Sequence, residues 1–145
     1  MGLLALMQAE LTAQDLYQVL AEHDEASIFV RTVQEAGLTK KLSGGGPYTI
    51  FVPTDEALGS LQDRINRSST NWKERFVMNH VITGMGSKRQ IVAMSKAPTL
   101  GGHVLSITES NDEVVINEAT NGATIIRANI RADNGMIHLI NAVLE

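Results

Sequence analysis

The sequence predicts a single α+β domain, in which a helical first half precedes a second half of short strands joined by hairpins. Apolar residues recur at helical spacing through most of residues 12–97, interrupted by one β-rich run at 48–52. After Gly101-Gly102 the pattern changes to short β-branched runs separated by turn dipeptides, which are Asn111-Asp112, Asn121-Gly122 and Asn134-Gly135. Helices followed by hairpins, instead of helices alternating with strands, favour α+β over a doubly wound α/β fold.

Capping residues and glycines set the expected element boundaries. Thr12 with Asp15 has capping-box spacing, Thr54 stands as an N-cap before two acidic residues, and Gly37 is a C-terminal stop. The polar stretch 64–70 is expected to be an exposed loop. The predicted helices cover residues 12–20, 24–36, 38–42, 54–61, 71–81 and a short segment from 87 that Pro98 closes. The predicted strands are 48–52, 103–107, 113–117, 124–130 and 136–144.

Composition and charge set the broad class of the protein. A chain of 145 residues with 43% hydrophobic and 19% charged residues can bury a core in one domain without disulfides or metal. The net charge of −4 gives no general attraction to nucleic acid or to an anionic membrane. The absence of cysteine excludes disulfides and thiolate catalysis. No apolar stretch approaches the roughly 20 residues of a transmembrane segment.

Three segments, in order along the chain, form recognisable motifs. Residues 48–58 read Tyr-Thr-Ile-Phe-Val-Pro-Thr-Asp-Glu-Ala-Leu, residues 80–84 read His-Val-Ile-Thr-Gly, and residues 134–144 read Asn-Gly-Met-Ile-His-Leu-Ile-Asn-Ala-Val-Leu. The outer two resemble the paired signatures of the fasciclin (FAS1) domain family, and the middle one resembles its central segment. The resemblance covers about 16–144 and implies a β-wedge of short, mostly antiparallel strands flanked by helices.

The resemblance also implies a domain organisation and a place of action. It predicts one FAS1 domain over residues 1–145, with a core at about 12–144 and residues 1–11 as an N-terminal extension. It implies an extracellular protein, either secreted or at the cell surface, and a periplasmic one in a bacterium. Asn66-Arg67-Ser68 has the sequence of an N-glycosylation site within the expected loop, so Asn66 is a candidate acceptor in a eukaryotic source.

The function that the resemblance implies is cell adhesion or protein interaction without catalysis and without a cofactor. The implied partners are cell-surface or matrix proteins, an integrin-like receptor among them. In animal members a Tyr-His pair flanked by branched aliphatic residues is implicated in integrin binding, but here Asn79 stands in the place of the tyrosine. The candidate partner-binding residues are Asn79, His80, Val81 and Ile82. Adhesion through them requires that some of the aliphatic side chains be exposed.

Two other functions remain open at this point. Lys73, Arg75, Lys88 and Arg89 cluster in sequence around the central motif, and such a basic patch would bind glycosaminoglycan or another polyanion. A solvated helical face is the simpler interpretation of these charges. The chain could also be a structural spacer excised from a multidomain surface protein.

The signature residues have a structural interpretation. Thr54 and Asp55 are expected to cap a helix, and His80 and His138 to be packed histidines with backbone partners. No histidine pair has compact metal-ligand spacing, and no serine lies in a Gly-x-Ser-x-Gly elbow, so an enzyme is not expected. The expected structural positions are Thr49, Phe51, Pro53, Thr54, Asp55, Asn134, Gly135 and His138.

Overall fold

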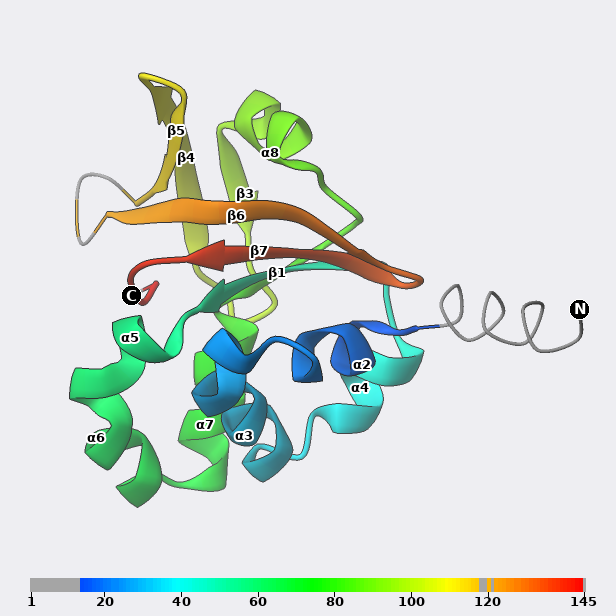
Figure 1. Ribbon diagram of the computed structural model, residues 1–145, viewed down its shortest axis with the longest axis vertical. Helices are drawn as coiled ribbons and strands as arrows, with labels where there is room; N and C mark the ends of the chain where they lie inside the picture. Colours follow the sequence, from blue (N-terminus) through cyan, green and yellow to red (C-terminus); the bar gives the residue numbers. More distant parts are fainter. Residues whose placement is uncertain (1–13, 118–119, 121, 145) are drawn as a thin grey trace, which may run out of the picture.

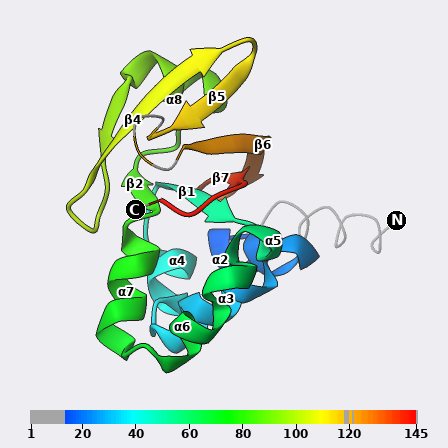
Figure 2. The ribbon, with the colours of Figure 1, turned by 90° about the vertical axis from the view of Figure 1, so that its left-hand side faces the viewer.

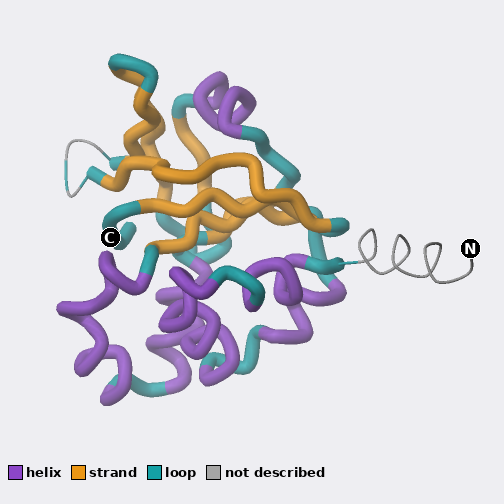
Figure 3. Tube along the Cα trace, viewed as in Figure 1, coloured by secondary structure: helices purple, strands orange, loops and turns teal. Residues whose placement is uncertain are grey.

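A seven-stranded sheet lies against a layer of helices in the computed structural model, which describes residues 14–117, 120 and 122–144 (Figures 1 and 3). The helical elements are α2 (Leu16–Ala21), η1 (Asp24–Ala26), α3 (Ser27–Glu35), α4 (Thr39–Gly44), α5 (Asp55–Leu58), η2 (Gly59–Leu61), α6 (Gln62–Arg67), α7 (Thr70–Met78) and α8 (Lys88–Met94). The strands are β1 (Tyr48–Pro53), β2 (Val81–Thr83), β3 (Lys96–Pro98), β4 (Val104–Ser110), β5 (Glu113–Ile116), β6 (Ala123–Ala132) and β7 (Gly135–Ile140). The predicted α+β class is confirmed.

The sheet has the strand order β2-β1-β7-β6-β5-β4-β3. Strands β1 and β7 are parallel and in register from the pair Tyr48–Gly135 to the pair Pro53–Ile140. The other pairings between the described strands are antiparallel. The two sequence signatures, about 85 residues apart, are therefore adjacent strands at the centre of the molecule.

Two hydrophobic clusters cover the two faces of this central strand pair. Ile50, Val52, Ile137 and Leu139 face the helical layer and pack with α2, α3 and α7. Phe51 and Ile140 belong to the opposite cluster, which includes residues of α8 and of strands β3 to β6. Side chains thus alternate along β7, with Ile137 and Leu139 on one face and Ile140 on the other. Strands buried on both faces explain why both signatures are continuous apolar runs.

Several predicted boundaries differ from the structure. The expected loop at 64–70 is wrong, because α6 occupies most of it and buries Ile65 completely in the helical cluster. The helix expected to reach residue 81 ends at Met78, and Val81 begins strand β2. Thr12 lies outside the described residues, and the capping box of α2 is formed by Asp15 with Gln18. A single buried aliphatic residue among polar neighbours was too weak a periodic signal to indicate α6.

Asn134, the first residue of the second signature, ties three separate segments together. Its Nδ2 donates hydrogen bonds to the carbonyl oxygens of Leu42 (2.9 Å) and Gly45 (2.7 Å). Its Oδ1 accepts a bond from the Leu16 N–H at 2.7 Å, and its backbone oxygen accepts one from the Tyr48 N–H. One side chain thus joins the start of α2 to the end of α4 beside β1.

Position 135 is a glycine because the surrounding atoms leave no room for a side chain there. A Cβ atom at this position would lie 2.2 Å from the Tyr48 carbonyl oxygen and 2.6 Å from a methyl group of Leu16. Both contacts are far shorter than van der Waals separation, and one of them is to a backbone atom that cannot move aside. Gly135 is therefore fixed by packing. The hairpin turn lies one residue earlier than the sequence predicts, at Asp133-Asn134, and Gly135 already pairs with Ala132 as the first residue of β7.

We expect Asn134→Asp to lower the free energy of unfolding by about 3 kcal/mol, because it removes both donors and places a carboxylate against two carbonyl oxygens. Asn129→Asp is the matched control, since Asn129 uses its Oδ1 to accept the Lys88 N–H and an aspartate keeps that acceptor. Its expected loss is under about 1 kcal/mol. Urea unfolding of the two variants measures both values. Equal losses would show that Asn134 has no special role.

Candidate functional site

The four residues expected to bind a partner are mostly inside the protein. His80 and Val81 are fully buried, and Ile82 is 2% exposed. Asn79 is half-buried at the end of α7. The burial arises because β2 pairs with β1, so that Val81 packs beneath α7 and Ile82 faces the opposite hydrophobic cluster. The requirement that aliphatic side chains of this segment be exposed is not met, so the expectation of an adhesive surface at His80, Val81 and Ile82 is corrected.

His80 is a structural histidine with both ring nitrogens bonded. The Leu144 N–H donates to Nε2 at 3.1 Å, so Nε2 is the acceptor of a neutral ring, and Nδ1–H donates to the Phe76 carbonyl oxygen at 2.7 Å. The ring also packs between Phe29 and Phe76, with centroid distances of 5.8 and 4.9 Å. Burial lowers the pKa of His80 to about 4, although its bond to Phe76 acts in the opposite direction.

His138 has the same structural character in the other cluster. The Asn129 N–H donates to Nδ1 at 3.1 Å, so Nε2 carries the proton and donates to the Gly86 carbonyl oxygen at 2.8 Å. The ring stacks on Phe51, its register partner in β1. Burial lowers the pKa of His138, and the positive charge of Lys88 acts in the same direction. His138 is thus held neutral and has no ring nitrogen free for a substrate.

Thr49 and His138 together hold the connection between β2 and α8. The Thr49 Oγ1 donates to the Gly84 carbonyl oxygen at 2.7 Å and accepts the Gly86 N–H at 2.8 Å. Since His138 binds the Gly86 carbonyl oxygen, both polar backbone groups of Gly86 are satisfied by the two signatures. These side chains therefore position the loop between β2 and α8.

The polar end of the first signature caps two helices. The Thr54 Oγ1 accepts the Ala57 N–H at 3.3 Å and caps α5. Asp55 lies in the first turn of α5, but its Oδ1 accepts the Ile28 N–H at 2.7 Å and its Oδ2 accepts the Ser27 hydroxyl. It therefore caps α3, whose own N-cap side chain makes no hydrogen bond. The carboxylate stabilises the positive end of that helix dipole.

The expected polyanion patch does not form one surface. Lys73 is 9% exposed, and its Nζ lies 3.0 Å from the Glu35 carboxylate. Arg75 is exposed on α7, whereas Lys88 and Arg89 belong to α8, at the opposite end of the molecule from α7 (Figures 1 and 2). The cluster existed in sequence because α7 and α8 follow one another, but β2 and its loop separate them in space.

Three further features concern the candidate glycosylation site, metal ligands and membrane spans. Asn66 is exposed, but it lies in the last turn of α6, and its Oδ1 accepts a bond from the Arg31 guanidinium at 3.1 Å. Within the described residues, no three His, Asp or Glu side chains are grouped to hold a metal ion. No helix in that part of the chain has the length and apolarity needed to cross a bilayer.

A groove beside α7 contains residues that sequence reasoning missed. It has a volume of about 450 Å³ and is lined by Trp72, Arg75, Phe76, Asn79, Gly101, His103 and Leu144. The first four lie at i, i+3, i+4 and i+7, which is one face of a helix and could have indicated a common surface. Gly101, His103 and Leu144 come from elsewhere in the chain, and no sequence signal links them to α7.

We expect the free energy of unfolding to fall as the pH decreases from about 6.5 to about 4. The unfolded histidine takes up a proton below 6.5, whereas buried His80 stays neutral down to about 4, so its contribution is complete above 6.5 and is lost on acidification. The lowered pKa of His138 acts in the same direction. The His80 contribution is roughly 3 kcal/mol.

Urea unfolding at several pH values measures this dependence. His80→Gln should flatten the slope between pH 4 and 6.5. A slope that is the same in the variant and in the parent protein would contradict the assignment to His80.

Comparisons with known proteins agree with this geometry. The family model described as "Fasciclin domain" matches residues 24–145. The Synechocystis sp. protein sll1483 is 28% identical over 138 residues, which are 92% of this chain and 74% of that protein. Transforming growth factor-beta-induced protein ig-h3 of Sus scrofa is 33% identical over 130 residues, 88% of this chain and 18% of that protein. Human stabilin-1 is 26% identical over 88% of this chain and 5% of its own length.

A solved structure has the same fold. A FAS1 domain pair from the insect cell adhesion molecule Fasciclin I superposes with a TM-score of 0.77 at 16% identity, covering 91% of this chain and 51% of that chain. Its fold corresponds to the helices and mostly antiparallel sheet described above. Because the family model covers most of the chain, from before α3 to the C-terminal segment, the chain belongs to the fasciclin domain family.

Proposed function

We propose that this chain is an adhesion domain that binds a protein of the cell surface or the extracellular matrix and catalyses no reaction. The observation that carries the proposal is the fasciclin match over residues 24–145, because this family is found in adhesion proteins such as ig-h3 and the stabilins. The proposed location is extracellular, and an integrin-like receptor is within the class of proposed partners.

The bonding of the two buried histidines supports the non-catalytic part of this proposal. A general base needs a ring nitrogen that can reach a substrate proton. In His80 and His138 the described backbone groups already occupy both nitrogens of each ring. Adhesion instead needs a rigid exposed surface, and the groove along α7 offers one that the folded core positions.

Binding of glycosaminoglycan through Lys73, Arg75, Lys88 and Arg89 is less favoured by the arrangement of these residues. Polyanion binding gains from several cations that act on one ligand at once. Here Lys73 is paired with Glu35, and Arg75 and the two α8 cations point to separate regions. Lys88 and Arg89 do line a shallow cavity with Glu109, but that carboxylate opposes an anionic ligand. The spacer hypothesis is also less favoured, because it assigns no binding role to the groove beside α7.

We expect a surface coated with the folded domain to support cell attachment, and soluble domain to compete for it. Soluble heparin should not compete, since we assign the contact to a protein partner. A heat-unfolded coat of equal density is the control for nonspecific adsorption. Attachment that heparin abolishes would favour glycosaminoglycan binding, and attachment equal to that of the unfolded coat would favour the spacer.

A further inference from the structure

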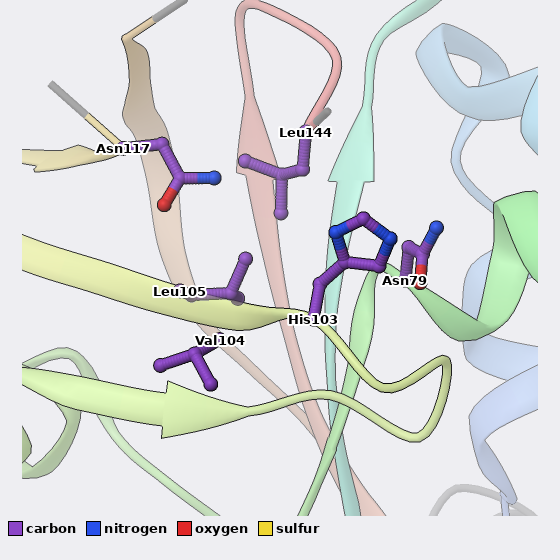
Figure 4. A pocket seen from close by; sticks show the side chains of 6 residues that line it. All are labelled: Asn79, His103, Val104, Leu105, Asn117 and Leu144. Carbon is purple, nitrogen blue, oxygen red and sulfur yellow. The ribbon is translucent and has the colours of Figure 1, made fainter. Parts of the chain in front are cut away.

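The groove beside α7 continues into a smaller cavity. This cavity has a volume of about 30 Å³ and is lined by Asn79, His103, Val104, Leu105, Asn117 and Leu144. Asn79, His103 and Leu144 line both spaces. Figure 4 shows the His103 ring between the Leu144 side chain and the Asn79 amide. These three residues form the boundary between an open groove and a narrow inner space.

Asn79 provides an unused hydrogen-bond acceptor at this boundary. Its Oδ1 is buried and has no hydrogen-bond partner among the described residues. The oxygen packs against Gly101, where a Cβ atom would lie only 1.9 Å from it. An unpaired buried carbonyl oxygen destabilises the folded protein, because it has lost its hydrogen bonds to water. Because this oxygen accepts no hydrogen bond, the half-buried side chain can rotate towards the groove without losing one. A ligand N–H that donates to the oxygen then offsets the cost of its burial.

The charges of the groove favour an anionic ligand. Arg75 is exposed, and the described residues that line the groove include no carboxylate. Within the described residues, Arg75 has no carboxylate at salt-bridge distance, in contrast to Lys73, which faces Glu35 from the same helix. The Arg75 guanidinium is therefore able to bind a carboxylate by donating two parallel N–H···O hydrogen bonds.

The aromatic wall of the groove distinguishes between two kinds of anion. Trp72 already stacks with Phe76, at a centroid distance of 5.1 Å and an angle of 14°, and the Arg64 guanidinium lies over its ring at 5.6 Å. An indole with two stacking partners is a poor platform for a sugar ring. Its half-buried edge and the neighbouring Leu144 instead offer apolar surface to an aliphatic or aromatic side chain.

We propose that this groove binds an extended acidic segment of a partner protein. A side-chain carboxylate of the segment pairs with Arg75, a backbone N–H donates to the Asn79 Oδ1, and a neighbouring apolar side chain packs against Trp72, Phe76 and Leu144. The proposal rests on the proposed function, since it names the partner chemistry of an adhesion domain. It places the contact on the outer face of α7, next to the buried segment 80–82.

The test uses a phage-displayed library of random dodecapeptides, panned on the whole chain and counter-selected on an Arg75→Gln variant. Arg75 is exposed, so this variant should fold. We expect the selected peptides to be enriched in an acidic residue adjacent to an apolar one. Recovery of only neutral or basic peptides would overturn the proposal, as would the absence of any peptide that discriminates the variant from the parent protein.

A selected peptide is then synthesised and titrated against the protein by tryptophan fluorescence. Trp72 is the single tryptophan of the chain, so the signal reports on this groove. Arg75→Gln should weaken binding about tenfold or more, as expected for loss of a charge-assisted pair. Arg89→Gln on α8 removes the same charge elsewhere and should change the affinity less than about twofold. Equal weakening by both variants would show nonspecific attraction and overturn the site.

Two further comparisons separate this proposal from its alternatives. The same peptide with glutamine in place of its acidic residue should lose most of its affinity, and retained affinity would contradict the carboxylate contact. An oligosaccharide of uronic acids should not alter the fluorescence, whereas binding of it that depends on Arg75 would identify a saccharide groove instead. Cell attachment that survives Arg75→Gln would place adhesion elsewhere, and peptide binding without cell attachment would contradict only the proposed function.

Discussion

The parallel pairing of β1 with β7 is the interaction on which the rest of the structure depends. These strands are buried on both faces, so their side chains contribute to both hydrophobic clusters at once. Thr49 of β1 and His138 of β7 also hold the loop between β2 and α8, and Asn134, just before β7, holds the end of α4. Parallel strands need a long connection between them, which explains why the two signatures that form β1 and β7 are far apart in the sequence.

The fold could be predicted from the sequence where local signals were strong. The Asn111-Asp112 turn and the apolar run of β1 are both found in the structure. The turn expected at Asn134-Gly135 lies one residue earlier, because Gly135 already pairs with Ala132 as the first residue of β7. The helix α6 was missed because Ile65 is its one fully buried residue. The end of α7 was misplaced because His80 and Val81 continue the apolar spacing of the helix after its backbone has ended at Met78.

The candidate site was harder to predict, because exposure is a tertiary property. The residues at 80–82 are compatible with either a contact surface or a core strand, and only the packing of both faces of β2 decides between them. The sequence likewise predicts Lys73 as a surface cation, whereas in the structure it is buried and paired with Glu35. The groove itself joins three parts of the chain, α7, the turn after β3 and the C-terminal segment, whose proximity no local pattern encodes.

The capping of α3 by Asp55 has a consequence for folding. The helix precedes Asp55 in the chain, yet its first turn is completed by a carboxylate that arrives only after β1 has been made. A fragment that ends at Pro53 would contain every residue of α3 and still lack its cap. The cap thus joins α3 to α5 across the intervening strand, and α3 should reach its full stability only when the segment that follows β1 has folded with it.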